Sequence, residues 1–459
     1  MDFSSTNTAL WGPIVQIGVI AGLILGANIL RRKVKWIRNS LMPTAVLAGF
    51  ALLLLRTFHV FPISALFLET ITYHAIAVGF IALSLRIPEK QADDGALIGS
   101  KSGALIVSTY LVQALVGLVV SLTLSYTLMP ELFQASGILL PMAYGQRPGQ
   151  ANNVGGTYEK LGMVGGRSFG LSLAAVGYLC ACVVGVVFLN VLHRKGKIKR
   201  VKDKDYLSGS VTVDTFQDKN EMPVSESVDK FSVQMAIVFL VYLLTYLLTK
   251  GIVMLLQTVA PGLAETVGTL LWGFNFIVGS MIALLVRIVF AKLRKANVMK
   301  HQYQNNYLLN RVSGVAFDLM IVAGIASIDI DDLTGHWLPF LLMAVLGGIA
   351  TFVYLYFVCK KLYPRYHYEA FFSMFGMLTG TISSGVLLLR ELDPELKTPA
   401  SNNLVTGSSF AIVFGIPMLL LISFAPQTMP TTTFLALGII IVYLLALMLF
   451  MLRAGKKKK

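Results

Sequence analysis

Long apolar runs, separated by short polar or basic segments, extend along the chain from residue 10 to residue 452. The first run, 10–30, has about 20 residues, which is enough to cross the hydrocarbon core of a bilayer. Ten more runs follow, at 40–55, 69–85, 102–129, 168–192, 231–256, 268–290, 309–329, 337–358, 403–424 and 432–452. The pattern predicts an all-α polytopic membrane protein with about 11 transmembrane helices.

Two segments, 131–167 and 367–402, do not fit single spans, because glycine and small polar residues interrupt their apolar stretches. The order of the spans requires the first segment to begin and end outside the cell, and the second to begin and end inside. Non-helical backbone at membrane depth is tolerated only within protein or beside a wet cavity. We therefore predict two re-entrant hairpins that enter the membrane from opposite faces.

The two hairpins divide the chain into inverted five-element repeats. The predicted parts are a first repeat at 1–192 with spans 1–5, a cytoplasmic linker at 193–230, a second repeat at 231–425 with spans 6–10, and an extra C-terminal span with a basic tail at 426–459. Inverted repeats with interrupted segments in matching positions mark the binding sites of secondary transporters.

The basic residues predict the orientation of the chain. Only 13% of the residues are charged and 56% are hydrophobic, which excludes a large soluble enzyme, and the net charge of +15 could suggest binding to nucleic acid. However, 24 of the 38 Lys and Arg residues fall in five segments, 31–38, 194–204, 292–300, 360–365 and 453–459. Basic residues collect in cytoplasmic loops, so we expect the N-terminus outside, the C-terminus in the cytoplasm and no nucleic-acid partner.

The two predicted hairpins share a glycine pattern. Gly145 and Gly149 are separated by three residues, as are Gly376 and Gly380, and an offset of 231 residues relates the two pairs. Small polar residues follow each pair. A Gly-x3-Gly pattern alone can serve close helix packing, which is the alternative interpretation. Its occurrence at matching positions of both halves favours a binding site.

A helix interrupted at membrane depth exposes N–H groups that attract anions and carbonyl groups that suit sodium ions. The predicted substrate-binding residues are therefore Gly145, Arg147, Gly149, Gln150, Asn152 and Asn153 in the first hairpin and Gly376, Thr379, Gly380, Thr381, Ser383 and Ser384 in the second.

Arg147 carries a charge at membrane depth, where charges are costly and mark function by default. Its guanidinium can hold a carboxylate through two hydrogen bonds. The alternatives are that Arg147 extends outward to the membrane surface or pairs with Glu159.

Asp318 is the second charge inside a predicted span. It is a candidate for binding the coupling cation or a proton, together with Asn153 and Ser384. The alternative is an ion pair with Arg147 or with Arg311.

Other polar residues favour structural roles. His74, Gln113 and Asn275 lie within spans and are expected to form hydrogen bonds between helices. Asp332, at the external end of the eighth span, and Asp393, on the cytoplasmic limb of the second hairpin, are expected in solvent. The three cysteines fall in apolar runs, in numbers and spacings that favour packing over a disulfide or a metal site.

The sequence lacks the phosphate-binding Gly-x4-Gly-Lys-Ser/Thr pattern and the His-Glu-x2-His metal motif. ATP-driven transport is therefore not supported, and we expect neither enzymatic activity nor a cofactor other than the coupling ion.

The order of elements, the hairpin positions and the linker resemble the bacterial sodium/glutamate symporter family. The resemblance rests on the segments 41–49, 137–162 and 371–411 and covers the chain from about residue 10 to residue 425. It implies sodium-coupled uptake of an anionic amino acid by an elevator-like mechanism in a homodimer. It also implies a static scaffold, built from the first two spans of each half with the eleventh span as a candidate addition, and a moving domain with both hairpins.

The expected function is sodium-coupled symport of glutamate or a related small carboxylate across the inner membrane of a bacterial cell. A proton-coupled transporter, an exporter or a channel for another small anionic solute is the alternative.

Overall fold

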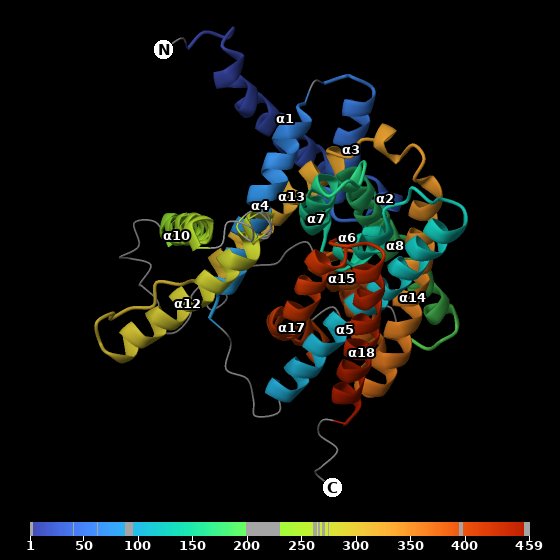
Figure 1. Cartoon of the computed structure of the whole chain (residues 1–459). Coiled ribbons are helices and arrows are strands. Elements are labelled where there is room, and N and C mark those ends of the chain that lie inside the picture. Colours follow the sequence, from blue (N-terminus) through green and yellow to red (C-terminus); the bar gives the residue numbers. More distant parts are fainter. Residues whose placement is uncertain are drawn as a thin grey trace. The chain divides into compact units, whose positions relative to one another are not determined.

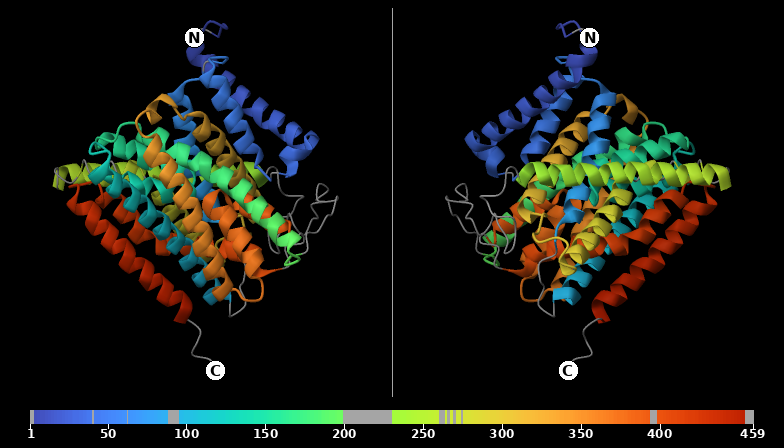
Figure 2. Two further views of the ribbon diagram at one scale, coloured as in Figure 1. Left: turned by 90° about the vertical axis from the view of Figure 1, so that its right-hand side faces the viewer. Right: turned by 90° about the vertical axis from the view of Figure 1, so that its left-hand side faces the viewer.

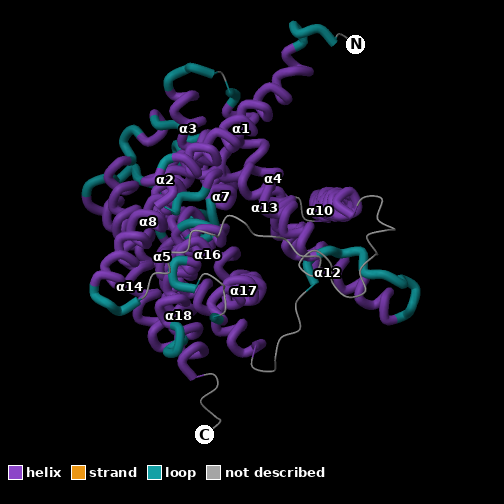
Figure 3. Tube along the Cα trace, turned by 180° about the vertical axis from the view of Figure 1, so that it is seen from behind, coloured by secondary structure: helices purple, strands orange, loops and turns teal. Residues whose placement is uncertain are grey.

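The computed structural model describes residues 3–39, 41–61, 63–87, 95–198, 230–259, 264, 267–268, 271–273, 275–393 and 398–453. In these residues every regular element is a helix (Figure 3). Most of the predicted linker at 193–230, namely 199–229, and the end of the basic tail, 454–459, lie outside the described residues.

The helices before the predicted linker are α1 Thr8–Lys33, α2 Lys35–Asn39, α3 Thr44–Thr57, α4 Ala65–Leu85, α5 Gly95–Thr127, η1 Gln134–Ile138, α6 Leu139–Tyr144, α7 Pro148–Lys160 and α8 Gly166–Arg194 (Figure 1). After it come α10 Lys230–Val259, α12 Asn275–Lys295, α13 Asn306–Ala326, η3 Asp331–Leu333, α14 Trp337–Leu362, α15 His367–Thr379, α16 Ile382–Arg390, α17 Pro399–Phe424 and α18 Thr431–Arg453.

Ten of the described helices are long and apolar enough to cross a membrane. They coincide with ten of the predicted spans, which confirms an all-helical chain compatible with a multi-pass membrane protein. The predicted span at 40–55 is the exception. It is α3, whose 14 residues extend only about 21 Å, short of the roughly 30 Å of a hydrocarbon core. Leu41 has a φ of 58° and Pro43 is the N-cap, so the helix cannot begin earlier.

The chain folds into two compact units. Unit 1 comprises Met1–Leu68, Gln91–Lys202 and Ile321–Lys459, and unit 2 comprises Glu69–Lys90 and Asp203–Met320. Unit 1 thus contains both of the segments that were predicted as hairpins and also α18, whereas the spans α10 and α12 belong to unit 2.

Unit 2 has an apolar core between α4, α10, α12 and α13. Ile81, Val241 and Ala283 are buried there with residues of the same character. Two predicted inter-helix hydrogen bonds are present in this unit: His74 Nδ1 lies 2.7 Å from the hydroxyl of Tyr242, and Asn275 Nδ2 donates to that hydroxyl over 3.1 Å.

In unit 1, α5 is the central helix, and α14, α17 and α18 pack against it (Figure 2). Aromatic rings join α8, α14 and α15: the ring of Phe188 lies 4.9 Å from that of Phe352 and 5.4 Å from that of Phe371, centroid to centroid. Such edge-to-face contacts are each worth about 0.5–1.5 kcal/mol beyond the buried area and hold α15 in place.

Candidate functional site at two helix breaks

The first break, residues 145–147, separates α6 from α7 and lies beside the middle of α5. Ahead of the break, Gly137 in η1 packs directly against Gly117 in α5. A Cβ on Gly117 would stand 2.0 Å from the carbonyl oxygen of Gly137. Gly145 then faces α5 near its midpoint, where a Cβ would stand 2.3 Å from the ring of Tyr110 and 3.0 Å from Oε1 of Gln113. Only glycine fits these positions.

The second break, residues 380–381, separates α15 from α16 and lies at the same level. Gln113 fixes it, since its Nε2 donates to the carbonyl oxygen of Leu378 over 2.9 Å and to Oγ1 of Thr351 over 3.0 Å. Thr351 is near the middle of α14. Gln113 therefore forms the predicted inter-helix hydrogen bonds and also connects the surroundings of both breaks.

The middle of α8 lies against both breaks. A Cβ on Gly177 would stand 2.5 Å from the carbonyl oxygen of Thr379 and 3.0 Å from the ring of Tyr144. The two broken segments approach this point from opposite ends of α8, because α7 packs against its start at Gly166 and α16 packs against its later part at Gly185. Figure 1 shows α6, α8 and α15 beside one another.

Arg147 is the N-cap of α7 and has an unusual backbone. Its φ of 83° and ψ of 169° fall in a region that is essentially restricted to glycine and costs on the order of 1–3 kcal/mol for other residues. Pro148 follows at the first helical position and offers no N–H group. The residue is half-buried, and Tyr178 and Tyr110 are titratable residues near its guanidinium.

Pairing of Arg147 with Glu159 is ruled out. The two residues stand at opposite ends of α7, about 18 Å apart along its axis. Glu159 instead accepts a hydrogen bond from the backbone N–H of Arg167 over 2.9 Å and forms an ion pair with its side chain, with 3.4 Å between Nε and Oε2.

Three amide side chains on the first turns of α7 are buried, with 1% of Gln150, 5% of Asn152 and 7% of Asn153 exposed. Nε2 and Oε1 of Gln150, Oδ1 of Asn152 and Nδ2 of Asn153 have no hydrogen-bond partner among the described residues. A buried polar group without a partner costs about 1–3 kcal/mol, so each such group calls for an explanation. A polar solute at the first break would supply these partners.

The hydroxyls of the second break serve the local structure. Thr379 Oγ1 donates to the carbonyl oxygen of Phe375 over 2.8 Å, and Oγ1 of Thr381 accepts from the backbone N–H of Ser384 over 3.1 Å. Thr381 is thus the N-cap of α16, and its hydroxyl also lies 3.2 Å from Oγ of Ser384. The side chain of Ser383 lies outside the described part of the chain.

The residue-level match between the two breaks is wrong. Gly376 does not end a helix but lies inside α15, where a Cβ would stand 2.8 Å from the backbone of Gly385 in α16. It serves close packing of two helices, which was the alternative interpretation. Gly145 and Gly380 are the residues that follow α6 and α15, whereas Gly149 is the second residue of α7.

Asp318 lies in the part of α13 that belongs to unit 2, whereas Arg147 and the breaks belong to unit 1. It is exposed, on the same helix face as Arg311. The two are seven residues and about 10 Å apart along the helix, and Arg311 donates to the hydroxyl of Tyr307 over 3.3 Å and lies over its ring.

The prediction that Asp393 lies in solvent is wrong. Only 8% of the residue is exposed, and its Oδ2 accepts from the backbone N–H of Thr398 over 2.7 Å and from its hydroxyl over 2.5 Å. It stabilises the start of α17. Asp332 is exposed, as expected, and accepts a hydrogen bond over 2.8 Å from the hydroxyl of Ser168 at the start of α8.

Tyr110 and Tyr178 were not predicted from the sequence as parts of the site. The sequence signal that could have identified them is a tyrosine in the middle of a long apolar helix, where its hydroxyl needs a polar partner.

No protein-family model matches the chain, and no curated protein matches it either. In the part of the chain that the structure describes, no group of three or more His, Cys, Asp or Glu residues is placed to hold a metal ion.

Proposed function

We propose that the protein is a secondary active transporter that couples sodium influx to the uptake of glutamate or a related small carboxylate. The observation that carries the proposal is Arg147, held in a strained conformation at the start of α7, together with Gln150 on the first turn, whose buried amide has no partner among the described residues. Strain of this kind persists where the surrounding structure enforces it, and it clusters at functional sites.

The first break is suited to a carboxylate. The start of α7 carries a partial positive charge, and the side chain of its N-cap residue, Arg147, forms no capping hydrogen bond among the described residues. Arg147 adds a full charge and a planar fork that matches a carboxylate. The amides of Gln150 and Asn153 add N–H donors, while Oδ1 of Asn152 is an acceptor for the ammonium group of an amino acid.

The second break is suited to the coupling cation. The C-terminal end of α15 presents carbonyl oxygens with partial negative charge next to Gly380. Carbonyl groups at the ends of discontinuous helices coordinate sodium ions in transporters. We keep Ser384 at the start of α16, Asn153 on α7 and Asp318 on α13 as candidates for binding the coupling ion or a proton.

We propose an elevator-like mechanism because the chain divides into two compact units. Unit 1 carries both breaks and unit 2 carries neither. Of the helices that the resemblance assigns to the scaffold, α10 and α12 belong to unit 2, whereas α1, α3 and α18 belong to unit 1 with the breaks, so the division supports the proposal only in part. In this proposal the two broken segments are re-entrant hairpins, and the protein works as a homodimer in the inner membrane of a bacterial cell, with its C-terminus in the cytoplasm.

A substrate panel in proteoliposomes tests the function. Purified protein is reconstituted, and radiolabelled glutamate, aspartate and dicarboxylates are offered under an inward gradient of sodium, of protons, or of neither. A sodium-coupled symporter accumulates its substrate above the external concentration only with the sodium gradient. Accumulation with protons alone would favour the proton-coupled alternative, and mere equilibration would indicate a channel.

A further inference from the structure

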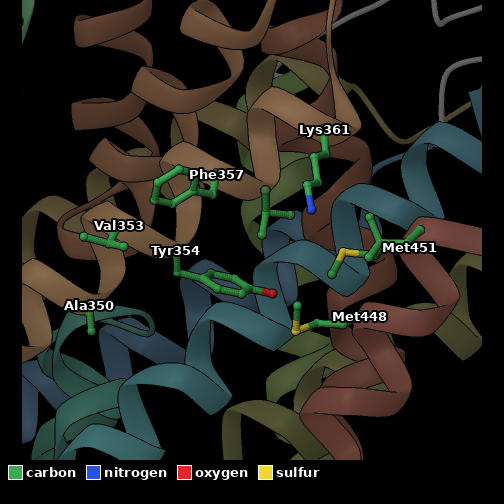
Figure 4. A pocket seen from close by; sticks show the side chains of 9 residues that line it. Ala350, Val353, Tyr354, Phe357, Lys361, Met448 and Met451 are labelled. Carbon is green, nitrogen blue, oxygen red and sulfur yellow. The ribbon is translucent and has the colours of Figure 1, made fainter.

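A groove in unit 1 lies between the C-terminal halves of α14 and α18 (Figure 4). Its volume is about 430 Å³, within the range of sites that bind small molecules. Ala350, Phe357 and Tyr354 of α14 and Met448 and Met451 of α18 supply an almost wholly apolar wall, and Lys361 is the charged residue of the lining.

The length of the groove corresponds to one leaflet of a bilayer. It extends from Ala350, in the middle of α14, to Lys361, in its last turn. Eleven residues of helix cover about 16 Å, and half of a hydrocarbon core is about 15 Å. An acyl chain that lies in the groove would therefore place its headgroup at the level of Lys361.

The charges at this end of the groove are basic. Lys360, Lys361 and Arg453 are exposed at the ends of α14 and α18, and the amino group of Lys361 points into the groove (Figure 4). The distribution of Lys and Arg in the sequence assigns this end to the cytoplasmic side. Basic pockets between membrane helices on that side bind anionic lipid headgroups.

We propose that the groove binds an anionic phospholipid of the cytoplasmic leaflet, with one acyl chain between α14 and α18 and the phosphate at Lys361. Met448 and Met451 are flexible side chains that adapt to an alkyl chain. Tyr354 donates from its hydroxyl to Oγ of Ser108 over 2.8 Å, so the wall of the groove is attached to α5, the helix that carries Gln113. The lipid site is independent of the transported solute.

Native mass spectrometry of the protein released from nanodiscs tests this site. The nanodiscs contain equal amounts of phosphatidylglycerol, which is anionic, and phosphatidylcholine, which has no net charge. We expect the wild type to retain phosphatidylglycerol preferentially. Lys361→Gln should lower the ratio of the two retained lipids about fivefold, the factor expected for one basic group near the headgroups. Lys295→Gln, which removes an exposed lysine from the last turn of α12, should leave the ratio unchanged.

A second variant, Ala350→Trp, fills the inner end of the groove and should reduce the retention of both lipids. Equal retention of both lipids by the wild type, or the same ratio in Lys361→Gln and Lys295→Gln, would overturn the proposal. A third result would also overturn the proposal: Ala350→Trp converts a dimer into a monomer while the retention of lipid stays constant. The groove would then bind a second copy of the chain and not a lipid.

Discussion

Gln150 buries both polar atoms of its amide without a hydrogen-bond partner among the described residues. An apolar side chain of similar size does not carry that cost. We predict that Gln150→Leu raises the unfolding free energy of the substrate-free protein by about 1–3 kcal/mol. The same substitution should abolish the stabilisation that substrate gives, since the amide is proposed to bind it. Thermal unfolding in detergent, with and without glutamate, measures both effects.

Gln113 provides the matched control for Gln150. It is also buried and its Oε1 has no hydrogen-bond partner among the described residues, but its Nε2 donates to Leu378 and to Thr351. Gln113→Leu should therefore lower the melting temperature, the opposite of Gln150→Leu. Equal destabilisation by both substitutions would show that Gln150 has a structural partner and would remove it from the proposed site.

Substitutions of Thr381 distinguish a local structural role from substrate binding at the second break. Its hydroxyl caps α16, so Thr381→Ala should destabilise the protein by about 0.5–2 kcal/mol. Thr381→Ser keeps the cap and should preserve stability. In both variants the dissociation constant for substrate should stay within about twofold of the wild type. A tenfold weaker binding by the alanine variant, measured well below its melting temperature, would make Thr381 a ligand after all.

On the scale of elements, the approach of the two breaks depends on α8 having no side chain at residue 177. A Cβ there would stand 2.5 Å from the carbonyl oxygen of Thr379, which cannot move aside without displacing the end of α15. We predict that Gly177→Ala lowers the melting temperature and reduces uptake, because overpacking costs about 1–3 kcal/mol.

The control for Gly177→Ala is Gly438→Ala in α18, where nothing lies within 4 Å of the added atom. This substitution should leave uptake unchanged and stability equal or higher, since alanine favours a helix over glycine by about 1 kcal/mol. Wild-type stability and uptake of Gly177→Ala would contradict the close approach of the two breaks.

The helices could be predicted from the sequence because each long apolar run must satisfy its own backbone hydrogen bonds. The exact break in the second segment could not. Both Gly376 and Gly380 can end a helix, and the choice depends on packing of Gly376 against Gly385 in α16. The shortness of α3 was visible in part, since its apolar run of 40–55 has only 16 residues, and Leu41 and Pro43 delay the start of the helix to Thr44.

The candidate site was predictable in part. Arg147 stood out because it is a charge beside glycines within an apolar segment. Its strained backbone and the burial of Gln150 depend on tertiary contacts that no local pattern contains. The same holds for Asp393, whose burial depends on a hydrogen bond to Thr398 across residues with no apolar pattern.

On the scale of the whole molecule, the distribution of basic residues predicts that both α14 and α18 end in the cytoplasm. We predict that a single cysteine at Thr6, in a variant without the three native cysteines, reacts with a membrane-impermeant maleimide in intact cells. A cysteine at Arg453 should react only after permeabilisation. Labelling of both positions in intact cells would contradict the assigned orientation.

The most direct test of the anion site at the first break is uptake by Arg147→Gly. Glycine accepts the φ of 83° without strain, so this variant should keep the melting temperature of the wild type while it loses the guanidinium. We predict that sodium-driven glutamate uptake in proteoliposomes falls about 10- to 100-fold, the loss expected for one charge-assisted pair, whereas Gln146→Gly retains activity. Wild-type uptake by a folded Arg147→Gly protein would contradict the proposal that Arg147 binds the substrate.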